Sequence, residues 1–243
     1  MRKFGFPERQ GLYNPAKEHD SCGFGFVANI KNCKSHEVVK QGLSVLSCLT
    51  HRGGAGADPL AGDGAGILIQ IPDKLFREDC KNLKISLPNP GEYGVGMVFL
   101  PRDKQNRKKC ELALEDLIAK EGLVVLGWRD LPTDNAWLSD SVREIEPFVR
   151  QVFIGKANSE MAQDDLEVKL FVIRKQSHQF AKKKQLAQDE AFYVTSMSSY
   201  TICYKGMMLP NRVSKYYIEL QDSRLESAIA LVHQRFSTNT FTS

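Results

Sequence analysis

Residues 19–28 read HDSCGFGFVA, a short apolar stretch that begins at Cys22 behind a polar leader. The leader, residues 1–21, contains Pro7 and Pro15 and little hydrophobic periodicity, so we expect an extended arm. If the leader is removed, the α-amine of Cys22, with an ordinary pKa of about 7.7–8.0, becomes a base for the thiol of the same residue. Taken alone, Cys22 is better explained as a small buried residue in a strand.

The composition is that of a globular chain. Its 243 residues are 42% hydrophobic and 26% charged, with a net charge of +4, which fits one large domain or two small ones. The dense basic runs, residues 107–109 and 182–184, are interpreted as solvated helix faces because no aromatic residues interleave with them. We therefore expect no nucleic-acid partner.

The targeting signals and the cysteine pattern of the sequence favour a cytoplasmic location. No apolar stretch approaches the roughly 18 residues that a membrane span requires, and the leader lacks the apolar segment of a secretory signal. The six cysteines, at positions 22, 33, 48, 80, 110 and 203, form no CxxC pair. This pattern favours reduced thiols over disulfides or a metal site.

A glycine-rich segment, HRGGAGADPLAGDGAG, occupies residues 51–66. Its glycines allow the backbone to approach a ligand or a second strand closely. The segment lacks the Gly-Lys-Ser/Thr of a phosphate-binding loop, and no GxGxxG stands between a strand and a helix, so phosphate binding is not expected. Without further information, Arg52 is equally well explained as a cation near a helix C-terminus.

A third motif, HQRFSTNT at residues 233–240, follows an apolar strand. Arg235 offers a planar cation, and Ser237 and Thr238 offer short hydroxyl donors, a set that suits a carboxylate ligand. A structural salt bridge at Arg235 remains the alternative.

The hydrophobic pattern predicts a mixed order of elements. Strands are expected at residues 23–30, 67–72, 95–100, 123–128, 168–175 and 228–237, with two more within 192–207. Helices are expected at residues 36–50, near 73–82, from about Asp103, at 139–150 and at 176–190. Because strands adjoin strands in the later half, the order favours packed sheets covered by helices over a regular βαβ repeat.

Together the motifs resemble a known family, the N-terminal class II glutamine amidotransferase domain of the glutamate synthase large subunit. The resemblance rests on CGFGFVA, on the glycine-rich segment with ILIQIP, and on HQRFSTNT. Supporting matches between them are GWRDLP (127–132), PFVRQVFIG (147–155), FYVTSMSS (192–199) and YKGM (204–207).

The resemblance implies an α+β fold, the four-layer αββα sandwich of N-terminal nucleophile (Ntn) hydrolases. It makes residues 1–21 a propeptide-like leader and residues 22–243 the amidotransferase domain. Cys22 would attack the side-chain amide of L-glutamine, forming a γ-glutamyl thioester and releasing ammonia. The catalytic residues would be Cys22, Arg52 and Gly53. The substrate would be bound by Arg235, Ser237 and Thr238.

The same resemblance implies partners outside these residues. Ammonia would pass to synthase domains of the same subunit that carry FMN and an iron–sulfur cluster and form glutamate from 2-oxoglutarate. A small reductase subunit is a further implied partner. No cofactor is expected in residues 1–243.

The sequence departs from the family pattern at Tyr200, where arginine is usual, and at Thr242, where proline is usual. The family also has an Asn-Gly oxyanion element and a substrate-binding aspartate that lie beyond Ser243. We therefore expect a domain truncated at its C-terminus, with little activity as an isolated 243-residue chain. The alternatives are an inactive fragment of such a subunit and another class II amidotransferase.

Overall fold

The computed structural model describes residues 8–14, 23–53, 61–158, 160–183 and 192–234. Its strands form two four-stranded antiparallel sheets, in the orders β1-β8-β2-β7 and β4-β5-β3-β6. The first sheet consists of β1 (Gly23–Ala28), β8 (Ile229–Gln234), β2 (Ala65–Gln70) and β7 (Thr201–Gly206). The second consists of β4 (Leu123–Asp130), β5 (Phe148–Lys156), β3 (Tyr93–Leu100) and β6 (Tyr193–Ser198).

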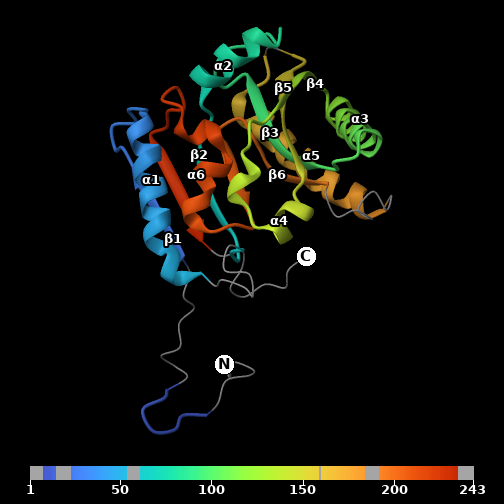
Figure 1. Cartoon of the computed structure of the whole chain (residues 1–243). Helices are drawn as coiled ribbons and strands as arrows, with labels where there is room; N and C mark the ends of the chain where they lie inside the picture. The colour runs from blue at the N-terminus through green and yellow to red at the C-terminus, as the bar shows by residue number, and fades with distance from the viewer. Residues whose placement is uncertain (1–7, 15–22, 54–60, 159, 184–191, 235–243) are drawn as a thin grey trace.

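Helices cover both sheets (Figure 1). The first sheet carries α1 (His36–Cys48), while α3 (Lys104–Lys120) and α5 (Gln163–Lys183) pack against the second. The shorter helices are α2 (Asp73–Asn82), α4 (Asp140–Glu144) and α6 (Val213–Tyr216), with 3₁₀ turns η2 (Leu49–Arg52), η3 (Asn135–Trp137), η5 (Pro210–Arg212) and η6 (Ile218–Gln221). Two antiparallel sheets with outer helices are consistent with the αββα sandwich that the resemblance predicts.

Two apolar cores hold these layers together. One joins α1 and α2 to both sheets, and includes Ile67 and Tyr204 of the first sheet and Met97 and Phe153 of the second. The other lies between the second sheet and helices α3 and α5. Burial of such side chains is the main favourable contribution to folding.

Helix starts follow ordinary capping chemistry. The hydroxyl of Ser35 accepts a hydrogen bond from the backbone N–H of Val38 at the start of α1. The carboxylate of Asp103 accepts one from the N–H of Asn106 at the start of α3. These bonds satisfy backbone donors that have no partner inside the helix, and Asp103 confirms the predicted start of that helix.

Two element predictions were wrong. Residues 168–175, expected as a strand, lie inside helix α5. A helix was expected at residues 139–150, but the observed helix α4 ends at Glu144. Residues 148–150 instead belong to strand β5, which begins at Phe148. The other predicted strands, and the helices at 36–50 and 73–82, are confirmed to within two or three residues at most described ends. The helix predicted at 176–190 is the end of α5 as far as Lys183, and residues 184–190 and 235–237 of these predictions lie outside the described residues.

Tyr200, a departure from the family pattern, lies in the turn between β6 and β7. Its hydroxyl donates a hydrogen bond to Asp164 Oδ1 over 2.6 Å, and Glu167 accepts bonds from the backbone N–H and the hydroxyl of Ser199. These hydrogen bonds therefore hold the turn between β6 and β7, which joins the two sheets, against the start of α5.

Candidate functional site

The predicted site residues divide into two groups. Arg52 and Gly53 are described by the structure, whereas Cys22, Arg235, Ser237 and Thr238 lie outside the described residues. The geometry available is therefore that of Arg52, Gly53 and the covalent neighbours of Cys22 and Arg235.

Those two neighbours lie opposite each other. Gly23, which follows Cys22 in the sequence, pairs with Gln234, which precedes Arg235, at the end of the β1–β8 ladder. Gln234 also pairs with Ala65 of β2, and Ala65 pairs with Gly206 of β7. One end of the first sheet thus collects the residues next to two of the predicted site positions.

The turn that carries Arg52 and Gly53 lies against this strand end. A β-carbon placed on Gly23 would come within 2.9 Å of Arg52 Cβ and 3.0 Å of the Gln234 carbonyl oxygen. A β-carbon on Gly53 would overlap Gln234 Nε2. Glycine at both positions is what lets the turn and the two strands approach so closely.

A shared acceptor fixes the turn. The carbonyl oxygen of Thr50 accepts a hydrogen bond from the backbone N–H of Gly53 and another from Gln234 Nε2, each over 3.3 Å. The hydroxyl of Thr50 donates to the Ser47 carbonyl over 2.6 Å. The Arg52–Gly53 pair is therefore held by bonds from both α1 and β8.

Two polar groups here have no protein partner within the part of the chain that the structure describes. Arg52 is exposed, and no hydrogen bond or ion pair joins its guanidinium to a described residue. Gln234 is 3% exposed, and its Oε1 is buried without a hydrogen bond to any described residue. The sequence analysis missed Gln234, although the alternating burial of β8 places it on the inward face.

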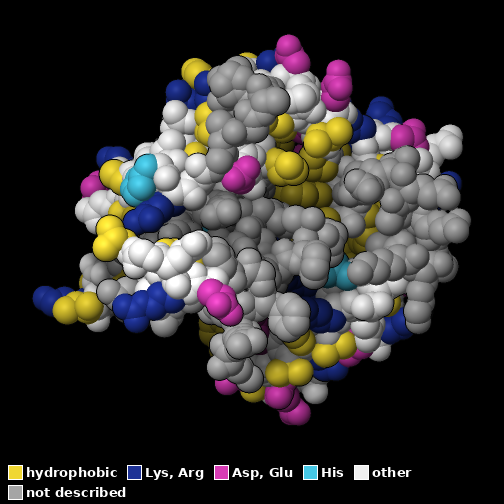
Figure 2. Space-filling model, turned by 90° about the horizontal axis from the view of Figure 1, so that it is seen from below, with side chains coloured by type: hydrophobic (Ala, Val, Ile, Leu, Met, Phe, Trp, Pro, Cys, Tyr) yellow, Lys and Arg dark blue, Asp and Glu magenta, His cyan; other side chains and the backbone are white. Residues whose placement is uncertain are grey.

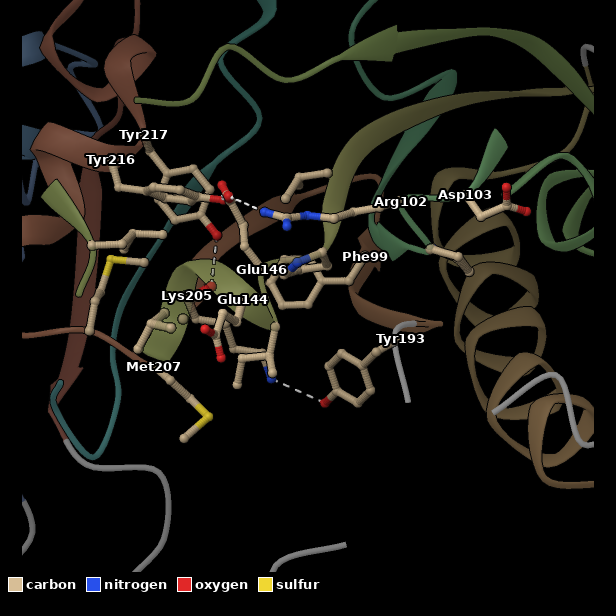
Figure 3. Close-up of a pocket in the computed structure, with 18 residues that line it drawn as sticks. Phe99, Arg102, Asp103, Glu144, Glu146, Tyr193, Lys205, Met207, Tyr216 and Tyr217 are labelled. Atoms are coloured by element: carbon tan, nitrogen blue, oxygen red, sulfur yellow. Dashed lines mark hydrogen bonds and ion pairs between the residues drawn. The ribbon is translucent and has the colours of Figure 1, made fainter. Parts of the chain in front are cut away.

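A separate cavity of about 730 Å³ lies where the ends of β3 and β7 meet α4 and α6 (Figure 3). Hydrophobic side chains make up much of its wall, among them Phe99, Met207, Tyr216 and Tyr217. From below, the molecule also shows hydrophobic side chains gathered beside scattered charged ones (Figure 2).

Three charged side chains of this cavity contact other side chains of its wall. Arg102 Nη2 lies 2.8 Å from Glu146 Oε2, and the Tyr216 hydroxyl donates to Glu146 Oε1 over 2.9 Å. Lys205 Nζ donates to the Tyr193 hydroxyl over 3.1 Å. Burial by itself would raise the pKa of Tyr193, but the hydrogen bond and the charge of Lys205 bring it below its usual value. Arg102, Glu146 and Lys205 therefore each contact another side chain of the cavity wall.

No metal centre is formed by the described residues, in which no three His, Cys, Asp or Glu side chains gather. The five described cysteines are free thiols, as predicted. Burial raises the pKa of Cys80 and of Cys110 to about 11, so neither is an activated nucleophile. None of the described helices is both long and apolar enough to cross a bilayer.

Comparison with known proteins identifies the family. The model for class-II glutamine amidotransferases matches residues 22–243. The NADPH-dependent glutamate synthase large chain of Bacillus subtilis is 49% identical over 97% of this chain and 15% of the relative. The NADH-dependent glutamate synthase of Saccharomyces cerevisiae is 39% identical over 98% of this chain and 11% of the relative. A ferredoxin-dependent glutamate synthase of Arabidopsis thaliana is 37% identical over 96% and 14%.

The chain spans only 11–15% of the length of these relatives. The family model begins at Cys22, the residue that the sequence motif singles out. The chain belongs to the class-II glutamine amidotransferases, and the relatives that it matches are glutamate synthases.

Proposed function

We propose that the chain is the glutaminase domain of a glutamate synthase and that it hydrolyses L-glutamine through a thioester on Cys22. The observation that most supports this proposal is that the Gly23–Gln234 pair lies beside the Arg52–Gly53 turn. Consecutive α-carbons are about 3.8 Å apart, so Cys22 and Arg235 are each one peptide from that pair. This supports a site shared by the start of β1, the end of β8 and the turn after α1.

The proposed reaction begins with removal of residues 1–21, which frees the α-amine of Cys22. That amine takes the thiol proton, and the sulfur adds to the side-chain carbonyl carbon of glutamine. The C–N bond then breaks, the amine returns a proton to the leaving nitrogen, and ammonia departs. Water attacks the resulting thioester, releasing glutamate and restoring the thiol.

The other predicted residues bind and orient the substrate. Arg235 is proposed to hold the α-carboxylate of glutamine through a charge-assisted pair, with Ser237 and Thr238 lining the same pocket. Arg52 and Gly53 are proposed to border the reacting amide. The exposure of Arg52 and the contact between its turn and the Gly23–Gln234 pair support this assignment.

The larger reaction is proposed for parts of the protein beyond this span. Ammonia would pass to synthase domains with FMN and an iron–sulfur cluster, and a small reductase subunit would supply electrons there. The described cysteines do not gather into a group that could hold a metal cluster. A cytoplasmic location, with no membrane or nucleic-acid partner, is part of the same proposal.

The test is replacement of Cys22 by alanine in the complete protein. Glutamine-dependent glutamate formation should fall by at least a thousandfold, because the nucleophile is gone, while formation of glutamate from added ammonia should persist. A variant that retains glutamine hydrolysis would show that Cys22 is not the nucleophile. A Cys33→Ala variant, which removes an exposed thiol, is the matched control and should leave both activities unchanged.

A further inference from the structure

Gln234 combines a structural contact with an unused acceptor. Its Nε2 donates to the Thr50 carbonyl oxygen over 3.3 Å, while its Oε1 is buried and accepts no hydrogen bond from the described residues. A buried carbonyl without a donor lowers stability. A methionine side chain of similar length would occupy this space without that cost.

The carboxamide also determines where the neighbouring turn lies. There is no room for a β-carbon on Gly53, because Gln234 Nε2 occupies that position. On the other side of the turn, Arg52 Cβ closely approaches Gly23. The Arg52–Gly53 pair is therefore closely packed against both the Gln234 side chain and Gly23, the first residue of β1.

We infer that Gln234 is a positioning residue of the glutaminase site. Its Nε2 holds the Arg52–Gly53 turn at the correct distance from β1, and its Oε1 accepts a hydrogen bond when glutamine occupies the site. This inference rests on the proposed function, because it needs a glutamine site beside Arg52. Displacing a positioned group by about 1 Å costs as much as a hundredfold in rate, so loss of the carboxamide should affect turnover.

The experiment measures glutamine hydrolysis by the complete protein carrying Gln234→Met. We expect kcat to fall about tenfold or more, KM to change by less than about threefold, and the unfolding temperature not to fall. The matched control is Gln70→Met, at the other end of β2, where Gln70 Oε1 accepts from the Ala228 N–H over 2.8 Å. The control should lower the unfolding temperature and leave kcat unchanged.

A second variant, Gln234→Glu, gives a readout that a merely structural role would not move. Protonated glutamic acid can donate to the Thr50 carbonyl as the amide does, whereas the carboxylate cannot. The activity of Gln234→Glu relative to the wild type should therefore rise as the pH falls toward the pKa of the new carboxyl group. A ratio independent of pH, or a Gln234→Met variant with wild-type kcat, would overturn the inference.

The same experiments distinguish an error about Gln234 from an error about the proposed function. If hydrolysis by the wild type does not depend on Cys22, the proposed function fails whatever Gln234 does. If Cys22 is essential and Gln234→Met turns over normally, only the role of Gln234 is wrong. A fall in kcat for Gln234→Met that is matched by a fall in unfolding temperature would assign Gln234 a structural role and would likewise overturn the inference.

Discussion

The guanidinium of Arg129 in β4 lies 2.6 Å from the carboxylate of Glu219 in η6, and both side chains are almost completely buried. Glu219 also accepts hydrogen bonds from Tyr204 in β7 and Gln151 in β5, and Arg129 contacts Asp79 as well. Burial by itself would lower the pKa of Arg129, but the two carboxylates raise it. One polar network therefore ties the second sheet to β7 of the first.

Glu219→Gln should destabilise this junction by about 3 kcal/mol, because removing one partner of a buried pair leaves an uncompensated charge. The value lies at the low end of the usual range, since Asp79 still faces Arg129. Hydrogen exchange of peptides covering residues 123–130 and 148–156 in the complete protein would measure the local free energy. Glu37→Gln, which removes an exposed pair with Lys40, should change it by no more than about 0.5 kcal/mol. Equal effects of the two variants would contradict the assignment.

Gly53→Ala should reduce glutamine hydrolysis about tenfold or more. The added methyl group has to displace Gln234 Nε2 or move the turn, so that Arg52 shifts relative to β1. The measurement is kcat/KM for glutamine in the complete protein. Gly155→Ala is the control, since its new methyl group meets only the flexible end of Leu126 in the second sheet, and it should leave kcat/KM close to wild type. Full activity of Gly53→Ala would show that the turn is not part of the site.

Stability should fall as the pH drops below about 6.5, the unperturbed pKa of histidine, partly through His178. Burial and the charges of Arg174, Lys175 and Lys205 lower its pKa in the folded protein, and its ring stacks on Tyr193 at 4.9 Å. The unfolded chain then binds more protons than the folded one in this range, so acid favours unfolding. His178→Gln should flatten this dependence, as measured by hydrogen exchange of α5 corrected for intrinsic rates. An unchanged slope would exclude His178 as a contributor.

Four of the five described cysteines should fall into two reactivity classes. Cys33 and Cys48 are exposed, whereas Cys80 and Cys110 are buried with pKa values raised to about 11. At pH 8, alkylation of the buried pair in the folded protein should be slower by more than about a hundredfold, because the thiolate is the reacting species. Peptide mass spectrometry after timed labelling measures each rate, and similar rates at all four positions would contradict the described core.

The sequence predicted most elements because their apolar periods are clear, and it failed where two periods overlap. Val168, Leu170 and Val172 alternate as in a strand, yet Leu166, Leu170 and Ile173 are the buried residues and follow helical spacing. The helix predicted at 139–150 runs across Pro147, whereas the structure ends helix α4 at Glu144 and begins strand β5 at Phe148. In both places the tertiary environment, the face of the second sheet, decided between local alternatives.

For the site, the family resemblance predicted Arg52 and Gly53 but not the contacts that hold their turn in place. The Gly23–Gln234 pairing joins positions more than 200 residues apart, and only the register of β1 and β8 brings them together. A single sequence carries no direct signal for such a register. The sequence of β8, IALVHQ, is apolar at four consecutive positions, so only the alternating burial seen in the structure places Gln234 on the inward face.

The most direct test of the central claim is mass spectrometry of the complete protein after incubation with an electrophilic diazoketone analogue of glutamine. The account predicts a chain that begins at Cys22 and carries one covalent adduct on the sulfur of that residue, formed in step with the loss of glutamine hydrolysis. A fully active protein that retains residues 1–21, or an adduct on another residue with Cys22 unmodified, would contradict it.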